Sequence, residues 1–366
     1  MGKVKILTGV IGKGKGGMSL FAVGLFERLD QEKFDVTFLT NDPEPYFGKE
    51  ILAHGGHLAY IPSRLRYPLA HKKALRKILR EGNFDVCHIH LSTASNIDPL
   101  IEAHRAGVPR VIAHSHNTGV EGNALARLLH RKNAGKIQKY TTDRLACSRL
   151  AGEFMYAGAD FTVVKNAIDL DRFAYSPETR RRMREQLGFG DKLVVGHIGR
   201  MSMQKNPRYL LETFRAVKDL EPESVLCYVG DGPMEGEIRQ HAEELGILPD
   251  IVFTGQVPNP QDYLCAFDCF LLPSLFEGLG FVVIESACSG LVCFASDVIP
   301  EEARVCDLVR TFSLSEKPEA VAKRIVSQRQ DPAVRAGQGE RLRELGYDFA
   351  SQKRQVEAIY TGERSL

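Results

Sequence analysis

Short apolar runs alternate with amphipathic stretches along the whole chain. The apolar runs predict strands at residues 4–10, 34–40, 57–62, 84–90 and 110–116. Apolar residues at helical spacing between them predict helices at residues 18–29, 47–54, 69–80 and 98–106. Strands that alternate with helices are typical of βαβ units and a parallel sheet. The first half of the chain is therefore expected to form an α/β domain.

The alternation starts again in the second half. Strands are predicted at 193–199, 224–230, 250–255, 269–274 and 291–296, with helices at 207–220, 234–245 and 280–289. The intervening stretch NAIDLDRFAYSPE carries Pro and Asp, which marks a boundary. A chain of 366 residues is also long for one hydrophobic core. We expect two Rossmann-like doubly wound domains, at 1–168 and 169–345, and a closing helix at 346–366 that could pack back on the first domain.

Composition narrows the class of protein. With 43% hydrophobic and 26% charged residues, the chain resembles a folded globular protein and neither a disordered nor a fibrous one. No apolar run is long enough to cross a bilayer, and the first residues lead directly into a strand, so a cytoplasmic location is predicted. The eight cysteines show no paired metal-ligand spacing and are interpreted as reduced core residues.

Charge is distributed unevenly although the net charge is only +2. Residues 1–168 hold 24 Lys and Arg against 15 Asp and Glu, a surplus of +9, and the remainder carries −7. A basic half favours an anionic partner, either a phosphorylated acceptor or a membrane surface, although chance asymmetry is the alternative. No nucleic-acid partner is indicated.

A glycine-rich loop follows the first strand and opens the first helix. Gly12, Gly14 and Gly17 satisfy the spacing G-x-G-x-x-G of dinucleotide-binding loops, with Asp42 as the acidic residue that such a site needs. An NAD-dependent oxidoreductase is therefore one alternative. A P-loop reading has Gly14-Lys15 in place but lacks the Ser or Thr that should follow the lysine. All these readings share a backbone that approaches a phosphate at a helix N-terminus.

Three polar motifs follow strands of the second half. The loop after residue 199 carries Arg200 and Lys205, a guanidinium and an ammonium that together could neutralise a diphosphate. The turn Gly230-Asp231-Gly232-Pro233 brings its backbone into close approach to another group. The run that begins at Leu275 places Glu277 in a loop and Glu285 in the following helix. Carboxylates accept hydrogen bonds from hydroxyls, so the pair suits sugar hydroxyls beside phosphate.

These motifs, in this order and over nearly the whole chain, resemble the retaining glycosyltransferases of GT-B architecture, the group 1 family that includes bacterial capsule and exopolysaccharide enzymes. The resemblance is carried by Gly16-Gly17, by HSHN at residues 114–117, and by VKNAID, GRMSMQKN, GDGP, VFTGQV and EGLGFVVIE. It implies two domains facing across a cleft and transfer of a sugar from a nucleoside-diphosphate sugar, UDP by family habit, to a glycan or lipid-linked acceptor in polysaccharide biosynthesis.

The resemblance also implies roles for particular residues. Arg200 and Lys205 would bind the donor diphosphate, Glu285 the ribose hydroxyls, and Glu277 the donor sugar. His116 would lie near the transferred sugar, so the predicted catalytic set is Glu277, His116, Arg200 and Lys205. The other residues placed at the donor are Gly16, Gly17, Gly230, Val257, Gly278, Leu279, Gly280 and Phe281.

Two histidine pairs end strands of the first half. His88 and His90, and likewise His114 and His116, alternate along a strand, so each pair lies on one face of the sheet. A metal site is the obvious alternative, but no carboxylate is close in sequence, and the basic pair of the second half replaces a cation at the diphosphate. No metal and no cofactor are therefore expected.

Three questions remain open at the level of sequence. Retention can proceed with the leaving phosphate taking the acceptor's proton, or with Glu277 as a covalent nucleophile. A sugar-nucleotide-binding subunit without turnover would keep the same residues, and a sugar-nucleotide epimerase could share the architecture. The nucleotide, the sugar and the acceptor are not fixed by any motif.

A basic helix at residues 69–80 suggests where the acceptor lies. Leu75, Ile78 and Leu79 recur at helical spacing beside a basic flank of Lys72, Lys73, Arg76, Lys77 and Arg80, with Arg64 and Arg66 before it. Such a helix is either a surface helix packed on the sheet or a peripheral contact with an anionic cytoplasmic leaflet.

Overall fold

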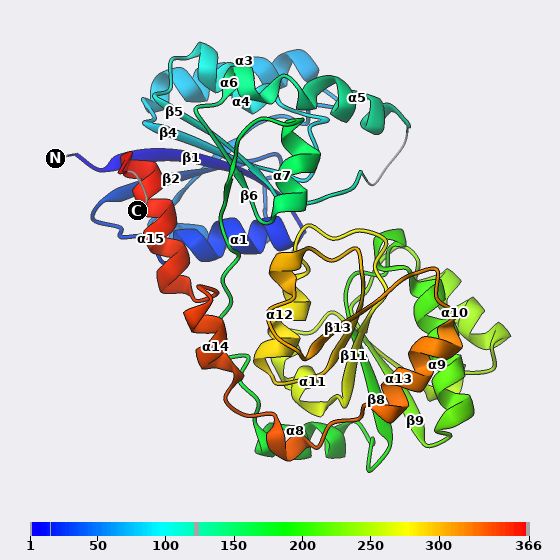
Figure 1. The fold of residues 1–366 in the computed structure, drawn as a ribbon. Helices are drawn as coiled ribbons and strands as arrows, with labels where there is room; N and C mark the ends of the chain where they lie inside the picture. Colours follow the sequence, from blue (N-terminus) through cyan, green and yellow to red (C-terminus); the bar gives the residue numbers. More distant parts are fainter. Residues whose placement is uncertain (1, 15, 121–123, 364–366) are drawn as a thin grey trace. The chain divides into compact units, whose positions relative to one another are not determined.

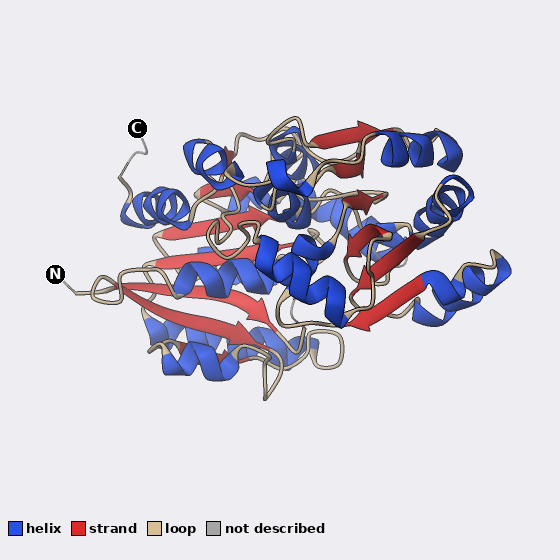
Figure 2. Cartoon of the chain, turned by 90° about the horizontal axis from the view of Figure 1, so that it is seen from below, coloured by secondary structure: helices blue, strands red, loops and turns tan. Residues whose placement is uncertain are grey.

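A computed structural model describes residues 2–14, 16–120 and 124–363 of the chain (Figure 1). The chain divides into two compact units. The first consists of Met1–Ala167 together with Phe349–Leu366, and the second is Ile168–Asp348. Each unit is built on one sheet of parallel strands. Figure 2 shows the strands in red and the helices that flank them in blue. The α/β class predicted from the alternating pattern is confirmed.

The first unit contains a seven-stranded sheet in the order β3-β2-β1-β4-β5-β6-β7. Its strands are β1 (Val4–Ile11), β2 (Phe34–Thr40), β3 (His57–Tyr60), β4 (Val86–Leu91), β5 (Arg110–Ser115), β6 (Asp143–Ala146) and β7 (Thr162–Val163). Its helices are α1 (Gly17–Phe26), α2 (Gly48–Ala53), α3 (Pro68–Gly82), α4 (Asp98–Arg105), α5 (Ala124–Ala134), α6 (Ile137–Tyr140), α7 (Arg149–Tyr156) and α15 (Phe349–Thr361). The strand order reverses between β1 and β4, which is the position where such sheets bind ligands.

The last helix, α15, completes the first unit. It packs beside α1, and the hydroxyl of Tyr360 lies 2.7 Å from Nδ1 of His88 in β4. Gln352 and Gln355 donate from their amides to the carbonyls of Lys165 and Val163, at 3.0 and 2.9 Å. Side chains from the end of the chain therefore satisfy polar groups of the segment that closes the first sheet.

The second unit contains a six-stranded sheet in the order β10-β9-β8-β11-β12-β13. Its strands are β8 (Leu193–Ile198), β9 (Ser224–Val229), β10 (Ile251–Gly255), β11 (Cys269–Leu272), β12 (Cys293–Ser296) and β13 (Val309–Phe312). Its helices are α8 (Pro177–Gln186), α9 (Pro207–Leu220), α10 (Glu235–Glu244), α11 (Pro260–Ala266), α12 (Phe281–Cys288), α13 (Pro318–Ser327) and α14 (Gln338–Glu344). Here the order reverses between β8 and β11.

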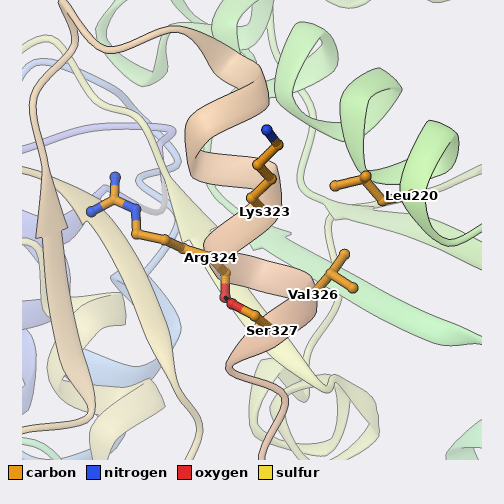
Figure 3. Close-up of a pocket in the computed structure, with 5 residues that line it drawn as sticks. All are labelled: Leu220, Lys323, Arg324, Val326 and Ser327. Atoms are coloured by element: carbon orange, nitrogen blue, oxygen red, sulfur yellow. Dashed lines mark hydrogen bonds between the residues drawn. The ribbon is translucent and has the colours of Figure 1, made fainter.

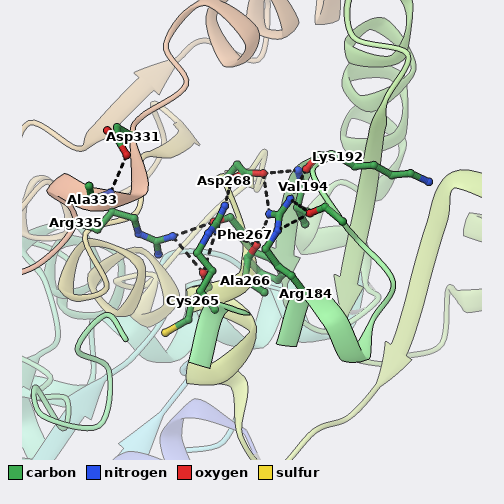
Figure 4. A network of polar contacts seen from close by, with 12 residues as sticks. Arg184, Lys192, Val194, Cys265, Ala266, Phe267, Asp268, Asp331, Ala333 and Arg335 are labelled. Carbon is green, nitrogen blue, oxygen red and sulfur yellow. Dashed lines mark hydrogen bonds and ion pairs between the residues drawn. The ribbon is translucent and has the colours of Figure 1, made fainter. Parts of the chain in front are cut away.

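A buried ionic network ties the second unit together (Figure 4). Asp268 accepts from Arg180 at 2.5 Å and from Arg184 at 3.1 Å, and its carboxylate also accepts the amide of Val194. The guanidinium of Arg335, 2% exposed, donates to the carbonyls of Leu264, Cys265, Phe267 and Ser289. These bonds fix the segment before β11 and the turn after α12. Glu277 lies in the loop that follows β11, and Glu285 lies within α12.

The cysteines and the apolar segments bear on two further expectations. All eight cysteines are free and buried, as their apolar surroundings indicated. Among the helices that the structure describes, none is long and apolar enough to cross a membrane.

Candidate functional site

Arg200, Lys205 and Glu277 gather at the point where the strand order of the second unit reverses, whereas Val257 follows the edge strand β10. The loops after β8 and β11 flank this point, since these two strands are neighbours in the sheet. The first loop carries Arg200 and Lys205, and the second carries Glu277. The amide of Leu275 donates to the carbonyl of Gln204 at 2.8 Å and joins the two loops directly. Residues separated by about seventy positions in sequence therefore form one site.

A buried ion pair lies at its centre. Nζ of Lys205 is 2.6 Å from Oε1 of Glu277, and the two side chains are only 14% and 6% exposed. The hydroxyl of Ser274 donates to the same oxygen at 2.6 Å, and Gln204 reaches Oε2 at 3.4 Å. These donors hold the carboxylate in one orientation. The arrangement presents a fixed carboxylate and an adjacent ammonium to anything that enters the site.

Close backbone packing shapes the loop that carries the two cations. Gly230, after β9, has φ +130°, and a Cβ there would lie 2.2 Å from the carbonyl oxygen of Gly199. The amide of Met201 donates to the carbonyl of Asp231 at 2.8 Å, and Met234 returns a bond to the carbonyl of Met201. Gly230 is thus required for the approach of the two loops. Its predicted direct contact with the donor stays a prediction.

Arg200 differs from Lys205 in its surroundings. Its side chain is exposed and forms no hydrogen bond or ion pair within the described part of the chain. Such an arginine keeps its planar donors available for an anion. The structure therefore leaves Arg200 open to a phosphate and holds Lys205 on a carboxylate.

The N-terminus of α12 adds backbone donors. Gly280 precedes the helix with φ +80°, a left-handed conformation that favours glycine. Gly278, Leu279 and Gly280 are buried, and Phe281 begins the helix. The first amides of a helix have no acceptor within it and favour an anion. The predicted contacts of these residues with sugar and phosphate are compatible with this geometry.

Glu285 lies one helical turn further along α12 and is partly buried. Burial raises the pKa of its carboxyl to about 7, against the opposing effect of the positive charge on Arg172. Its carboxylate accepts no hydrogen bond from the residues that the structure describes. Val257, predicted to contact the base, follows β10 and is half-buried.

The glycine loop of the first unit caps α1. Gly16 is the N-cap residue with φ −83° and ψ 160°, and Gly17 is the first residue of the helix. A Cβ at Gly14 or Gly16 would meet no protein atom within 4 Å. Neither backbone strain nor packing within the protein therefore requires glycine at position 16. A ligand that comes close to the backbone there would explain the missing side chain. Lys15 lies outside the described residues.

The structure brings the four histidines of the first unit together. His88 and His114 are 3.1 Å apart between Nε2 and Nδ1, and His90 and His116 are 2.9 Å apart between Nδ1 and Nε2. The ring of Phe21 packs against three of the four histidine rings. Burial lowers the pKa of His116 well below its usual value, as does neighbouring His90. His116 is therefore a neutral ring at neutral pH.

The metal alternative can be weighed against this geometry. Nitrogens of His88, His90 and His114 lie within 4.8 Å of one another. Ligands about 2.1 Å from a tetrahedral zinc ion are roughly 3.4 Å apart. The 3.1 Å between His88 and His114 is close to that spacing and is equally that of a hydrogen bond. The planes of the His88 and His114 rings are nearly parallel, at 7°, with their centroids 5.3 Å apart. Both His–His contacts have hydrogen-bond distances, and the expectation that no metal is needed stays a prediction.

Some of the positive charges on the basic helix α3 are paired with acidic side chains, so fewer of them are free than the sequence suggested. Arg64 and Lys72 lie 2.8 and 3.5 Å from the carboxylate of Asp98, and Arg76 pairs with Glu102 at 2.7 Å. Acidic residues of α4 thus neutralise much of the basic flank. These ion pairs could not be predicted from the sequence, because the paired residues are 26 to 34 positions apart along the chain.

Exposed apolar side chains lie just before α3 and in its first turn instead. Leu65 is 94% exposed, Leu69 84% and Tyr67 60%. Arg66, which stands among them, is also exposed. We call residues 65–69 the apolar loop.

A hollow elsewhere in the second unit lies between α9 and α13 (Figure 3). Its lining residues are Leu220, Lys323, Arg324, Val326 and Ser327. None of them belongs to the predicted site, and the hollow carries no functional assignment.

Three residues at the donor site of the second unit were not identified as candidates from the sequence. Ser274 and Gln204 orient Glu277, and His197 is buried beneath the loop that carries Lys205. Ser274 follows a strand directly, as other candidates do, so its position could have suggested it. Gln204 and His197 gave no signal, because only tertiary packing shows what their side chains contact.

Comparison with known proteins identifies the class. Residues 15–172 match the model of Glycosyltransferase Family 4, and residues 179–345 match that of Glycosyl transferases group 1. A protein of Bacillus subtilis (strain 168) that carries the name glycosyltransferase EpsF is 32% identical over 94% of this chain and 93% of its own length. The chain therefore belongs to the group 1 glycosyltransferases. It is a glycosyltransferase, and neither family model supports an oxidoreductase.

Two further relatives add detail. An Escherichia coli UDP-Gal:alpha-D-GlcNAc-diphosphoundecaprenol alpha-1,3-galactosyltransferase is 26% identical over 77% of this chain and 76% of its own. The crystal structure of Anabaena Alr3699/HepE in complex with UDP and glucose matches with a TM-score of 0.82 at 17% identity, over 98% of this chain and 99% of that one. The latter likeness confirms the GT-B fold.

Proposed function

We propose that this glycosyltransferase moves a sugar from a UDP-sugar to a glycan or lipid-linked acceptor in polysaccharide biosynthesis, with retention of the anomeric configuration. The observation that carries the proposal is the Lys205–Glu277 pair beside the N-terminus of α12, with Arg200 open on the same loop. Cations and helix amides beside a fixed carboxylate suit a diphosphate joined to a sugar. Relatives that act on a UDP-sugar or bind UDP support the choice of nucleotide.

The proposed chemistry needs stabilisation of a leaving group. The bond between the anomeric carbon and the donor's β-phosphate oxygen breaks, and negative charge builds on that oxygen. Arg200, Lys205 and the amides of residues 279–281 stabilise the charge, a contribution that is usually the largest in such reactions. The acceptor hydroxyl bonds to the anomeric carbon on the same face, and the leaving phosphate takes its proton. Glu277 as a covalent nucleophile is the alternative.

His116 is assigned a contact with the transferred sugar. Its Nε2 is already bonded to Nδ1 of His90, so Nδ1 is the nitrogen left for a sugar hydroxyl. Because the ring is neutral, Nδ1 either accepts from that hydroxyl or donates to it, according to the tautomer. Gly16 and Gly17 are assigned close approach to the donor. No metal takes part in this scheme, and full activity in excess EDTA is expected.

The acceptor is proposed to be presented at a membrane surface by the first unit. The exposed apolar loop with Arg66 supports this contact better than the charges of α3, because α4 pairs several of those charges. Apolar side chains beside a basic residue suit an interface of anionic lipids.

The test begins with ligand identity. Thermal unfolding is measured with UDP, GDP, ADP and their sugars, because a bound ligand raises the unfolding temperature. The preferred donor is then incubated with lipid-linked and free glycan acceptors, and the anomeric configuration of the product is read by NMR. A product of inverted configuration would refute retention. Tight donor binding without hydrolysis or transfer would instead indicate a sugar-nucleotide-binding subunit without turnover.

A further inference from the structure

His197 lies in β8, an inner strand of the second sheet, and is 0% exposed. Its Nδ1 is 2.8 Å from the carbonyl oxygen of Leu271. Because a carbonyl only accepts hydrogen bonds, Nδ1 carries the ring proton and Nε2 presents a lone pair. Burial lowers the pKa of His197 to about 4, so the ring is neutral at neutral pH.

The lone pair of Nε2 has no hydrogen-bond donor among the described residues. Leaving a buried acceptor unsatisfied destabilises a fold, and an apolar side chain in this strand would avoid that cost. The ring of Tyr228 packs edge-on against the imidazole, with centroids 4.7 Å apart, but its hydroxyl forms no bond with Nε2. The buried acceptor is therefore available to a donor that comes within reach of it.

The loop that carries Lys205 lies against this lone pair. A Cβ built on Gly199 would be 3.1 Å from Nε2 of His197 and 3.2 Å from Cε of Lys205. The charge of Lys205 also contributes to lowering the pKa of His197, as expected for an ammonium near the ring. His197 and Lys205 thus flank the same small space beneath the loop.

We propose that His197 is a positioning residue for Lys205, and that its Nε2 accepts one N–H of the Lys205 ammonium when a nucleoside diphosphate is bound. The inference rests on the proposed function, in which Lys205 binds the donor diphosphate. An ammonium has three N–H donors. With Glu277 taking one and the diphosphate another, His197 accepts the third and holds the cation in place. A neutral acceptor does this without cancelling the charge that the phosphate needs.

A double-mutant cycle tests the proposal with UDP and uridine as probes, measured by calorimetry. His197→Leu removes the acceptor at similar volume and is expected to weaken UDP binding about 10-fold. Uridine, which lacks the diphosphate, should bind unchanged. In the Lys205→Met background, His197→Leu should cause no further loss. His197→Gln, which retains both a donor for Leu271 and an acceptor, should restore most of the affinity. If His197→Leu does not fold, His197→Phe, which keeps a ring but has no acceptor, takes its place and should show the same loss.

The outcomes separate this inference from the proposed function. If Lys205→Met leaves UDP affinity unchanged, the proposed donor site is wrong. If Lys205→Met weakens UDP binding but His197→Leu weakens it equally in both backgrounds, only the inference is wrong, and a purely structural role or a bridging water explains the histidine. Equal losses for UDP and uridine would also overturn it. The 15N resonance of Nε2 should shift on addition of UDP and stay unchanged with uridine.

Discussion

Lys205 and Glu277 form an ion pair of 2.6 Å in which both side chains are largely buried. The ammonium thus has a partner before any donor arrives, and the carboxylate is neutralised in a site from which water is mostly excluded. Removing one member of a buried pair leaves the other charge without compensation. Effects of substitution on activity must therefore be separated from effects on stability.

Lys205→Met and Arg200→Met form a matched pair of variants. Both should lower the rate of sugar transfer at least ~10-fold, because each loses a charged donor to phosphate. Only Lys205→Met should also reduce the free energy of unfolding, by about 3 kcal/mol, since Arg200 is exposed. Transfer assays and urea denaturation measure the two effects. Unchanged transfer by the Arg200 variant would remove that residue from the site.

Glu277→Gln is expected to lower kcat more than it raises the KM for the donor, because the carboxylate is assigned to the reacting sugar. Ser274→Ala should have a smaller effect in the same direction, since its hydroxyl orients Glu277 at 2.6 Å. Steady-state kinetics with the preferred UDP-sugar provide the measurement. Mass spectrometry of the wild type during turnover looks for a glycosylated Glu277, and its detection would favour the covalent route.

Glu285 should make nucleotide binding depend on pH. Ribose hydroxyls donate to the ionised carboxylate, so UDP affinity should rise as pH increases through the pKa of about 7. For folding the sign is opposite. A raised pKa contributes stability that is complete below the unfolded value of about 4.5 and is lost as pH rises through about 7.

Calorimetric titrations with UDP between about pH 6 and pH 8 measure the binding effect. Glu285→Gln removes the titrating group and serves as control, because UDP's own phosphate also titrates near pH 6. A pH dependence that is the same in wild type and variant would show that Glu285 does not contact the ribose.

The apolar loop should determine membrane contact. The double variant Leu65→Ser and Leu69→Ser is expected to reduce flotation with liposomes of anionic lipid at low salt, because each buried leucine contributes about 1.5–3 kcal/mol. Leu220→Ser, which changes an exposed leucine of the second unit, should float like the wild type. Equal flotation of all three proteins, or none by the wild type, would argue for a soluble acceptor.

Arg335 should be among the residues most important for stability. Arg335→Met removes a donor from the carbonyls of Leu264 and Ser289, whereas those of Cys265 and Phe267 still accept from Arg180. It also leaves a gap in a buried network and is expected to cost about 3 kcal/mol of unfolding free energy. Arg343→Met, at a partly exposed arginine of α14, should cost less than ~1 kcal/mol. Denaturant unfolding compares the two variants, and similar costs would show that the Arg335 network is replaceable.

Much of the fold and of the donor site in the second unit could be predicted from local sequence patterns. Alternating strands and helices predicted both sheets, and the positions after strands pointed to Arg200, Lys205 and Glu277. The sequence missed the edge strand β13, whose four residues VRTF carry no apolar run. It also missed five helices, namely α5, α6, α7, α8 and α11. It also overestimated the free charge on α3, because the pairing of Arg76 with Glu102 is a tertiary contact.

The location of α15 bears on how the protein is made. The ribosome completes all strands of the first unit long before it reaches Phe349, and the whole second unit is synthesised in between. Until then His88 lacks the hydroxyl of Tyr360, and the carbonyls of Val163 and Lys165 lack their glutamine donors. Domains generally fold in the order in which they are synthesised. Here the first unit leaves the ribosome first, but it is complete only after the second unit has been synthesised. A premature stop codon before α15 would therefore damage the half of the protein that was translated first.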